Sequence, residues 1–99
     1  MIIHVAETGK VELKEKDDFK GFKIAVAKKG ADAAFIARAL EGVATLESDG
    51  KTAWVSQQAL RADQSASWVA AFDKMVESVR RFGWVRDDGT VRAHIEVAG

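Results

Sequence analysis

The C-terminal segment TVRAHIEV, residues 90–97, carries one of the two histidines of this chain, together with an arginine and a carboxylate at alternate positions. Apolar residues alternate there with Thr90, Arg92, His94 and Glu96. In a strand these alternate residues share one face. In that arrangement Glu96 would orient His94 or raise its basicity, and Arg92 would bind an anionic substrate.

The same pattern is typical of a solvent-exposed strand face, on which a cation and an anion flank a histidine two residues away on either side. No second constellation in the sequence supports a catalytic site, so we interpret His94 as an ordinary surface residue. A protein partner that covers this face is a third interpretation. We keep Arg92, His94 and Glu96 as candidate ligand-binding residues and assign no catalytic residue.

The only other histidine, His4, falls on the same face of a predicted first strand as Ile2 and Ala6. We expect it to be a hydrogen-bonded histidine at the edge of the core. A metal site made by His4, His94 and a carboxylate would require the first and last strands to be adjacent. The chain lacks cysteine and any ligand spacing such as HExxH, so we predict no metal and no other cofactor.

A predicted strand-to-helix connection contains Lys28, Lys29 and Gly30, and helix N-termini are places where anions bind. However, the Walker and GxGxxG patterns are absent. Asp32 is also placed to accept the free N–H groups that a phosphate would need. We therefore interpret this segment as an ordinary connection.

Trp54 lies on a strand that would match the third strand of an RNA-recognition domain, where aromatic side chains stack on bases. Fifteen basic residues balance fifteen acidic residues, and they are mixed along the chain. Nucleic-acid binding requires a one-sided basic surface, so we expect no nucleic-acid partner. Trp54 is expected in the core or in an interface.

The longest polar connection, SQQALRADQSAS at residues 56–67, has two interpretations. Long polar loops often carry binding residues, which here would be Gln57, Gln58, Arg61 and Asp63. The alternative, which we favour, is a helical turn anchored by Leu60. The serines lack a GxSxG elbow or a placed base, so nothing supports nucleophilic catalysis.

Period-two alternation predicts the strands that would carry these residues. It indicates hairpins at 2–15, 43–56 and 84–97, and a further strand with Phe22, Ile24 and Val26 on one face. The Asp49-Gly50 pair at the turn of the second hairpin favours a type I′ turn. In the last hairpin, residues 91, 93, 95 and 97 form the apolar face.

Helical periodicity predicts two helices. The first begins near Ala31, with Asp32 as N-cap, and ends at Gly42. The second begins near Ser67 and is closed by Gly83. Its predicted buried face consists of Trp68, Phe72, Met75, Val76, Val79 and Phe82.

From residue 22 to residue 97 the elements follow the order β-α-β-β-α-β, which indicates a ferredoxin-like core preceded by an N-terminal hairpin. We predict one α+β domain over residues 1–99, because chains of this length form a single core. Its antiparallel sheet would have five to seven strands, with two helices on one face.

The sequence shows no apolar run of the length of a signal peptide or a membrane span, and we expect a soluble cytoplasmic protein. An uncovered sheet face and free strand edges favour association. The leading functional prediction is therefore a non-catalytic protein-interaction or assembly module that forms a homodimer. The alternative is a small-molecule-binding protein or small enzyme that uses the open sheet face around Arg92, His94 and Glu96.

Overall fold

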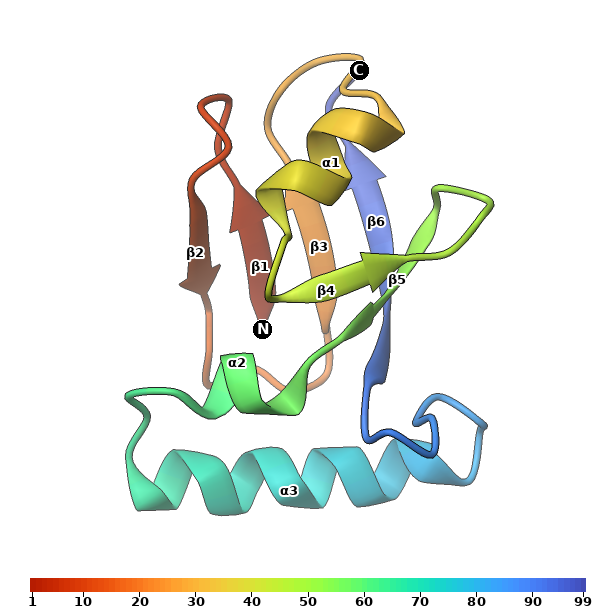
Figure 1. Ribbon diagram of the computed structural model, residues 1–99. Helices are drawn as coiled ribbons and strands as arrows, with labels where there is room; N and C mark the ends of the chain where they lie inside the picture. Colours follow the sequence, from red (N-terminus) through yellow and green to blue (C-terminus); the bar gives the residue numbers. More distant parts are fainter.

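A computed structural model describes residues 1–99 and shows an α+β fold (Figure 1). The strands are β1 (Ile2–Val5), β2 (Val11–Lys14), β3 (Lys23–Val26), β4 (Ala44–Leu46), β5 (Thr52–Val55) and β6 (Val91–Val97). The helices are α1 (Ala33–Ala39), α2 (Gln57–Arg61) and α3 (Ala66–Arg80). None of the three helices has the length and the apolar character needed to cross a membrane.

All six strands form one mixed sheet in the order β2-β1-β3-β6-β5-β4. The β1–β3 and β3–β6 pairs are parallel, and the other three pairs are antiparallel. The α+β class is confirmed, but the prediction of an antiparallel sheet is wrong. The reason is the pairing: β3 lies beside β1 instead of continuing from β2, so it runs in the same direction as β1.

The ferredoxin-like arrangement is not confirmed. The element order from β3 to β6 follows β-α-β-β-α-β with α2 added. In space, however, α1 connects β3 and β4, which lie three places apart in the sheet. A ferredoxin-like core instead splits each β-α-β unit around a single strand.

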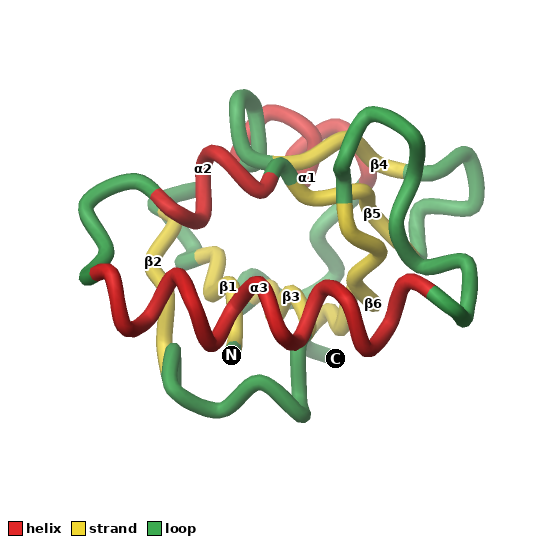
Figure 2. Tube along the Cα trace, turned by 90° about the horizontal axis from the view of Figure 1, so that it is seen from below, coloured by secondary structure: helices red, strands yellow, loops and turns green.

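The sheet curls, so that β4 crosses in front of β3 and β5 crosses in front of β6 (Figure 1). Seen from below, the strands form part of a ring, and α3 crosses its open end (Figure 2). All three helices contribute to the core inside this curl. There are three helices instead of the two predicted, and α1 and α3 lie at opposite ends of the sheet (Figure 1).

One apolar core fills the space between the inner face of the sheet and the helices. Phe72 is fully buried and stacks on Trp68, with ring centroids 5.1 Å apart. Met75 and Val76 are buried as predicted, and Val79 packs partly against them. The buried strand residues are Ile3, Val5, Ile24, Val26, Ala53, Val55, Val91, Ala93 and Ile95.

The prediction that Phe82 belongs to the buried face of α3 is wrong, because its side chain is 56% exposed. The helix ends at Arg80, and the chain reverses at Gly83, which has a φ of +76°. Only glycine adopts this left-handed conformation without strain. Phe82 lies in the turn before Gly83 and so leaves the helical stripe.

The start of α1 agrees with the sequence. Asp32 is the N-cap, and its carboxylate accepts a hydrogen bond of 2.8 Å from the N–H of Phe35. Lys28 lies over the ring of Phe35, 4.6 Å from its centroid. The N–H of Phe35, which a bound phosphate would need, is thus already hydrogen-bonded to Asp32. This agrees with the interpretation of the segment as an ordinary strand-to-helix connection.

The turn between β4 and β5 is not the predicted type I′ turn, which needs positive φ at two successive residues. Only Gly50 has a positive φ there. The carboxylate of Asp49 instead accepts a hydrogen bond of 2.9 Å from the N–H of Lys51. This turn is closed by the N–H of Gly50 donating to the carbonyl of Glu47 at 3.0 Å.

The last predicted hairpin is present in a reduced form. Its second arm is β6, and its first arm pairs only through an isolated bridge between Val85 and Val91. The N–H of Arg92 also donates to the carbonyl of Trp84 at 2.8 Å. These contacts place the short segment 84–85 beside β6.

Candidate functional site

The predicted polar face of β6 lies on the outer side of the curled sheet, which no helix covers (Figure 1). Arg92, His94 and Glu96 are exposed, whereas Val91, Ala93 and Ile95 are buried. The alternation is therefore confirmed for this strand. It ends at Val97, which was expected on the apolar face and is 39% exposed.

Glu96 is held by a residue of the neighbouring strand. Lys23 of β3 donates a hydrogen bond of 3.0 Å to the carboxylate of Glu96. This hydrogen bond and the charge of Lys23 lower the pKa of Glu96, and the charge of His94 contributes less. No hydrogen bond joins Glu96 to His94, so the carboxylate pairs with Lys23 instead of orienting the imidazole.

Arg92 and His94 line one hollow of about 270 Å³ on this outer face. Phe22, Thr52 and Trp84 complete its lining. We call it the Arg92 hollow. Arg92 and His94 come from β6, Thr52 pairs with His94 from β5, and Phe22 immediately precedes β3.

Arg92 has a tryptophan on each side. Trp54 lies opposite it on β5, and the Val85–Val91 bridge places Trp84 opposite it on the other side. The guanidinium of Arg92 makes no hydrogen bond and no ion pair within the chain. It is therefore free to bind a ligand or a partner.

The largest exposed apolar side chains lie next to Arg92. Phe82 and Trp84 are 56% and 41% exposed, and their ring centroids are 5.3 Å apart. They line a second hollow, of about 350 Å³, together with Trp54 and Glu47. We define the aromatic surface as Trp54, Phe82, Trp84, Arg86 and Arg92.

Glu47 fixes one side of this aromatic surface. The guanidinium of Arg86 lies over the ring of Trp54, 4.1 Å from its centroid, and donates a hydrogen bond of 2.6 Å to Glu47. The indole N–H of Trp54 donates to the same carboxylate oxygen. Trp54 is thus half-buried and lies outside the apolar core, and its place in an interface stays a prediction.

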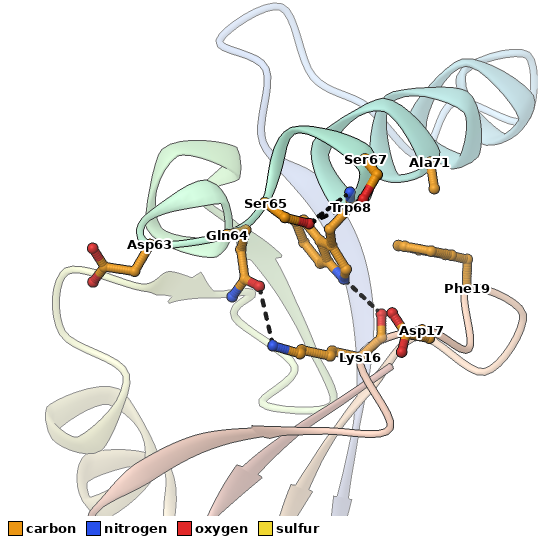
Figure 3. A pocket seen from close by; sticks show the side chains of 9 residues that line it. All are labelled: Lys16, Asp17, Phe19, Asp63, Gln64, Ser65, Ser67, Trp68 and Ala71. Carbon is orange, nitrogen blue, oxygen red and sulfur yellow. Dashed lines mark hydrogen bonds between the residues drawn. The ribbon is translucent and has the colours of Figure 1, made fainter.

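The largest hollow of the chain, of about 520 Å³, lies between residues 16–19 and the start of α3 (Figure 3). Its polar groups are mostly used within the protein. The indole N–H of Trp68 donates to the carbonyl of Lys16 at 2.8 Å, and the ammonium of Lys16 lies 3.4 Å from the side-chain oxygen of Gln64. Ser65 caps α3 by accepting the N–H of Trp68. We interpret these groups as the connection between the β2–β3 loop and α3.

The polar segment 56–67 contains the helical turn that the sequence favoured. It forms α2, and Leu60 is buried in the core. Gln57 donates to the carbonyl of Gly89, and Arg61 pairs with Asp73 of α3. The side chains of Gln57 and Arg61 thus connect α2 to Gly89 and to α3. Gln58 and Asp63 make no side-chain hydrogen bond.

The structure does not bring the two histidines together, because β3 lies between β1 and β6. No group of three or more His, Asp and Glu side chains is close enough to hold a metal ion. The Nδ1 atom of His4 is buried without a hydrogen-bond partner. The expected hydrogen bond at this nitrogen is therefore absent.

No protein-family model, no curated protein and no solved structure matches this chain.

The aromatic walls of the Arg92 hollow were not predicted from the sequence. Trp84 had a readable signal, because it alternates with Val85 and stands across the Asp88-Gly89 turn from Arg92. No signal in the sequence indicated that Thr52 and Phe22 would line this hollow. They reach the hollow only because β5 and β3 flank β6.

Proposed function

We propose that this protein is a non-catalytic protein-interaction module that forms a homodimer through the aromatic surface. The observation that carries the proposal is the exposure of Phe82 and Trp84 beside Arg92. Tryptophan and arginine are enriched among the residues that dominate binding energy at protein interfaces. Monomeric proteins seldom expose contiguous apolar patches without a function.

A second copy of the chain is the partner that we propose. The hollow at the aromatic surface is lined by groups of both charge signs, Arg92 and the carboxylates of Glu47 and Asp49. In a two-fold interface the same surface of both copies is in contact, so that residue i of one copy meets residue j of the other and j meets i. A surface that carries positive and negative groups can therefore pair each charge with an opposite charge of the second copy. The lack of cysteine suits a reducing compartment, so we place this module in the cytoplasm.

The state of His94 supports a non-catalytic role. A general base needs a hydrogen-bonded group that orients it and a nucleophile within reach. His94 makes no side-chain hydrogen bond, and the serine side chains that form hydrogen bonds lie at helix starts or within α3. Glu96, the carboxylate nearest in sequence, is paired with Lys23.

Sedimentation equilibrium of the intact chain tests this proposal. The wild type should form dimers at micromolar to high micromolar concentration. Phe82→Ser and Trp84→Ala should each weaken dimerisation at least about tenfold, as expected for central interface residues. Val97→Ser removes an exposed apolar side chain elsewhere on the sheet and should leave the dimer unchanged. A wild-type chain that stays monomeric at high micromolar concentration would exclude the proposal.

A second candidate function is supported by the Arg92 hollow. There the unpaired guanidinium of Arg92, the imidazole of His94 and Thr52 line one hollow with the aromatic side chains of Phe22 and Trp84. Few polar groups within an apolar lining are characteristic of small-ligand sites. On this proposal the chain binds a small molecule through Arg92 and His94, and Glu96 positions Lys23 at the border.

A further inference from the structure

We infer that the Arg92 hollow binds a carboxylate that is joined to an aromatic ring. This inference rests on the second candidate function, ligand binding on the outer face, and names the ligand class. Because Arg92 and Trp84 belong both to this hollow and to the aromatic surface, ligand binding and dimerisation would compete for them.

The guanidinium of Arg92 is the group that would hold the carboxylate. A guanidinium presents two parallel N–H donors whose spacing matches the two oxygens of a carboxylate. Among the residues lining this hollow, Arg92 is the only permanently charged one, and it has no partner of its own. The imidazole of His94, two residues further along the same face, offers an additional N–H donor.

The carboxylates around the hollow do not compete for this cation. Glu96 pairs with Lys23, and Glu47 accepts hydrogen bonds from Arg86 and Trp54. The carboxylate of Asp49 accepts hydrogen bonds from the N–H of Lys51 and the hydroxyl of Thr52. No Asp or Glu side chain lines the Arg92 hollow itself. The uncompensated charge in the hollow is therefore positive, which favours an anion over a cation or a neutral ligand.

The aromatic walls define the rest of the ligand. Phe22 and Trp84 line the same space as Arg92, and Trp84 is 41% exposed. A flat ring would remove both side chains from water and make offset or edge-to-face contacts with them. The volume of about 270 Å³ suits a ligand of one or two rings.

Two sources can supply this chemistry. A free aromatic acid carries the ring and the carboxylate in one small molecule. A polypeptide that ends in phenylalanine or tryptophan presents the same two groups at its C-terminus. The experiment therefore includes a probe of each kind.

The test is a titration of the ¹⁵N-labelled intact chain, followed by NMR. The first probe is phenylacetate, with phenylacetamide as an uncharged control and acetate as a control without a ring. Phenylacetate should shift the amide signals of Thr52, Trp84 and His94 and the indole signal of Trp84. Both controls should bind at least about tenfold more weakly, because each lacks one of the two recognised groups.

The variant Arg92→Gln removes the charge and keeps most of the side-chain length. It should weaken phenylacetate binding at least about tenfold and leave the weak binding of phenylacetamide unchanged. The matched control is Arg80→Gln, which removes an exposed arginine of α3 that pairs with Glu77 away from the hollow. This control should bind phenylacetate as the wild type does. The amide spectrum of each variant shows whether it is folded.

Three results would overturn the inference: equal binding of phenylacetate and phenylacetamide, unchanged binding in a folded Arg92→Gln variant, or the absence of shifts around the hollow at millimolar phenylacetate. The peptide acetyl-Gly-Gly-Phe, compared with its C-terminal amide, distinguishes the sources. Tighter binding of the peptide acid than of phenylacetate assigns the site to a chain terminus, and weaker binding assigns it to a free acid. A monomeric chain that binds phenylacetate refutes the dimer alone. If the wild type dimerises, the titration uses the folded, monomeric Phe82→Ser variant, because Phe82 lines the second hollow and not the Arg92 hollow. Failure of that monomer to bind phenylacetate refutes this inference alone.

Discussion

At the scale of single residues, the neighbouring strand determines what each polar side chain of β6 does. Glu96 stands two residues from His94 in the sequence but forms its hydrogen bond with Lys23, which is 73 positions away. Register explains this choice, because parallel pairing of β3 and β6 places Lys23 beside His94 and Ala25 beside Glu96. The small side chain of Ala25 leaves room for the Lys23 ammonium to reach the carboxylate.

Replacing Lys23 with methionine should raise the pKa of Glu96 toward its ordinary value. The hydrogen bond from Lys23 is the main cause of the lowered pKa, followed by the charge of the same residue. A carboxyl with a lowered pKa stabilises the fold above its ordinary pKa, and this contribution is lost as the pH falls through the lowered value. An NMR titration of the Glu96 side-chain carbon measures the change. Lys14→Met, at an exposed position of β2, serves as the control, and an unchanged Glu96 pKa in Lys23→Met would show that the ion pair is not formed in solution.

Replacing His94 with alanine should change the free energy of unfolding by less than about 0.5 kcal/mol, as is usual at surface positions. The side chain is exposed and makes no hydrogen bond. Urea denaturation of the variant and the wild type measures the difference. A loss above about 2 kcal/mol would mean that His94 is held in a buried network, as in the interpretation of a covered or catalytic histidine.

At the scale of elements, the two ends of α3 determine which residues of the predicted apolar stripe are buried. Ser65 begins the helix by accepting the N–H of Trp68, and the turn at Gly83 ends it. Phe72 and Phe82 are ten positions apart and belong to the same predicted stripe. Phe72 lies inside the helix and is buried, whereas Phe82 lies beyond the last helical residue and is exposed.

These two phenylalanines should therefore respond differently to the same change. Phe72→Ala should reduce the free energy of unfolding by about 3–5 kcal/mol, because it leaves a cavity beside Trp68. Phe82→Ala should cost less than about 1 kcal/mol, since its ring is already largely in water. Urea melts of both variants measure the costs. Equal losses would show that the helix continues past Gly83 or that its buried face is different.

At the scale of the whole molecule, β6 connects the two parts of the sheet. Its first half pairs with β5 and its second half with β3, so it joins the antiparallel part of the sheet to the parallel part. The edge strands β2 and β4 each have one neighbour only. The curl that closes the core follows from these pairings together with the packing of α1 and α3 against the inner face (Figure 2).

Amide hydrogen exchange should follow this arrangement. The paired amides of β3 and β6 should exchange most slowly, because they open only when most of the core opens. The amides of β4 should exchange faster, since this edge strand has three residues and one partner. Exchange measured by NMR at several denaturant concentrations gives the order. Slower exchange in β4 than in β6 would contradict the strand order described above.

The sequence alone determined the local features of this protein. The alternation of apolar residues predicted the hairpins at β1–β2 and β4–β5 and the buried face of β6. Helical spacing predicted α1, with Asp32 as its N-cap, and most of α3, although it extended the buried face of α3 to Phe82. These features depend on residues within a few positions of one another, where conformational preferences, caps and side-chain periodicity act directly.

Only the tertiary structure decided which strands are neighbours, and with that the mixed sheet and the composition of the outer face. Lys23 meets Glu96, and Phe22 and Thr52 meet His94, because β6 lies between β3 and β5. Local preferences do not distinguish this order from the ferredoxin-like one, since both bury the same faces of the same strands. The choice depends on loop closure over long stretches of chain and on how all the elements fill one core together.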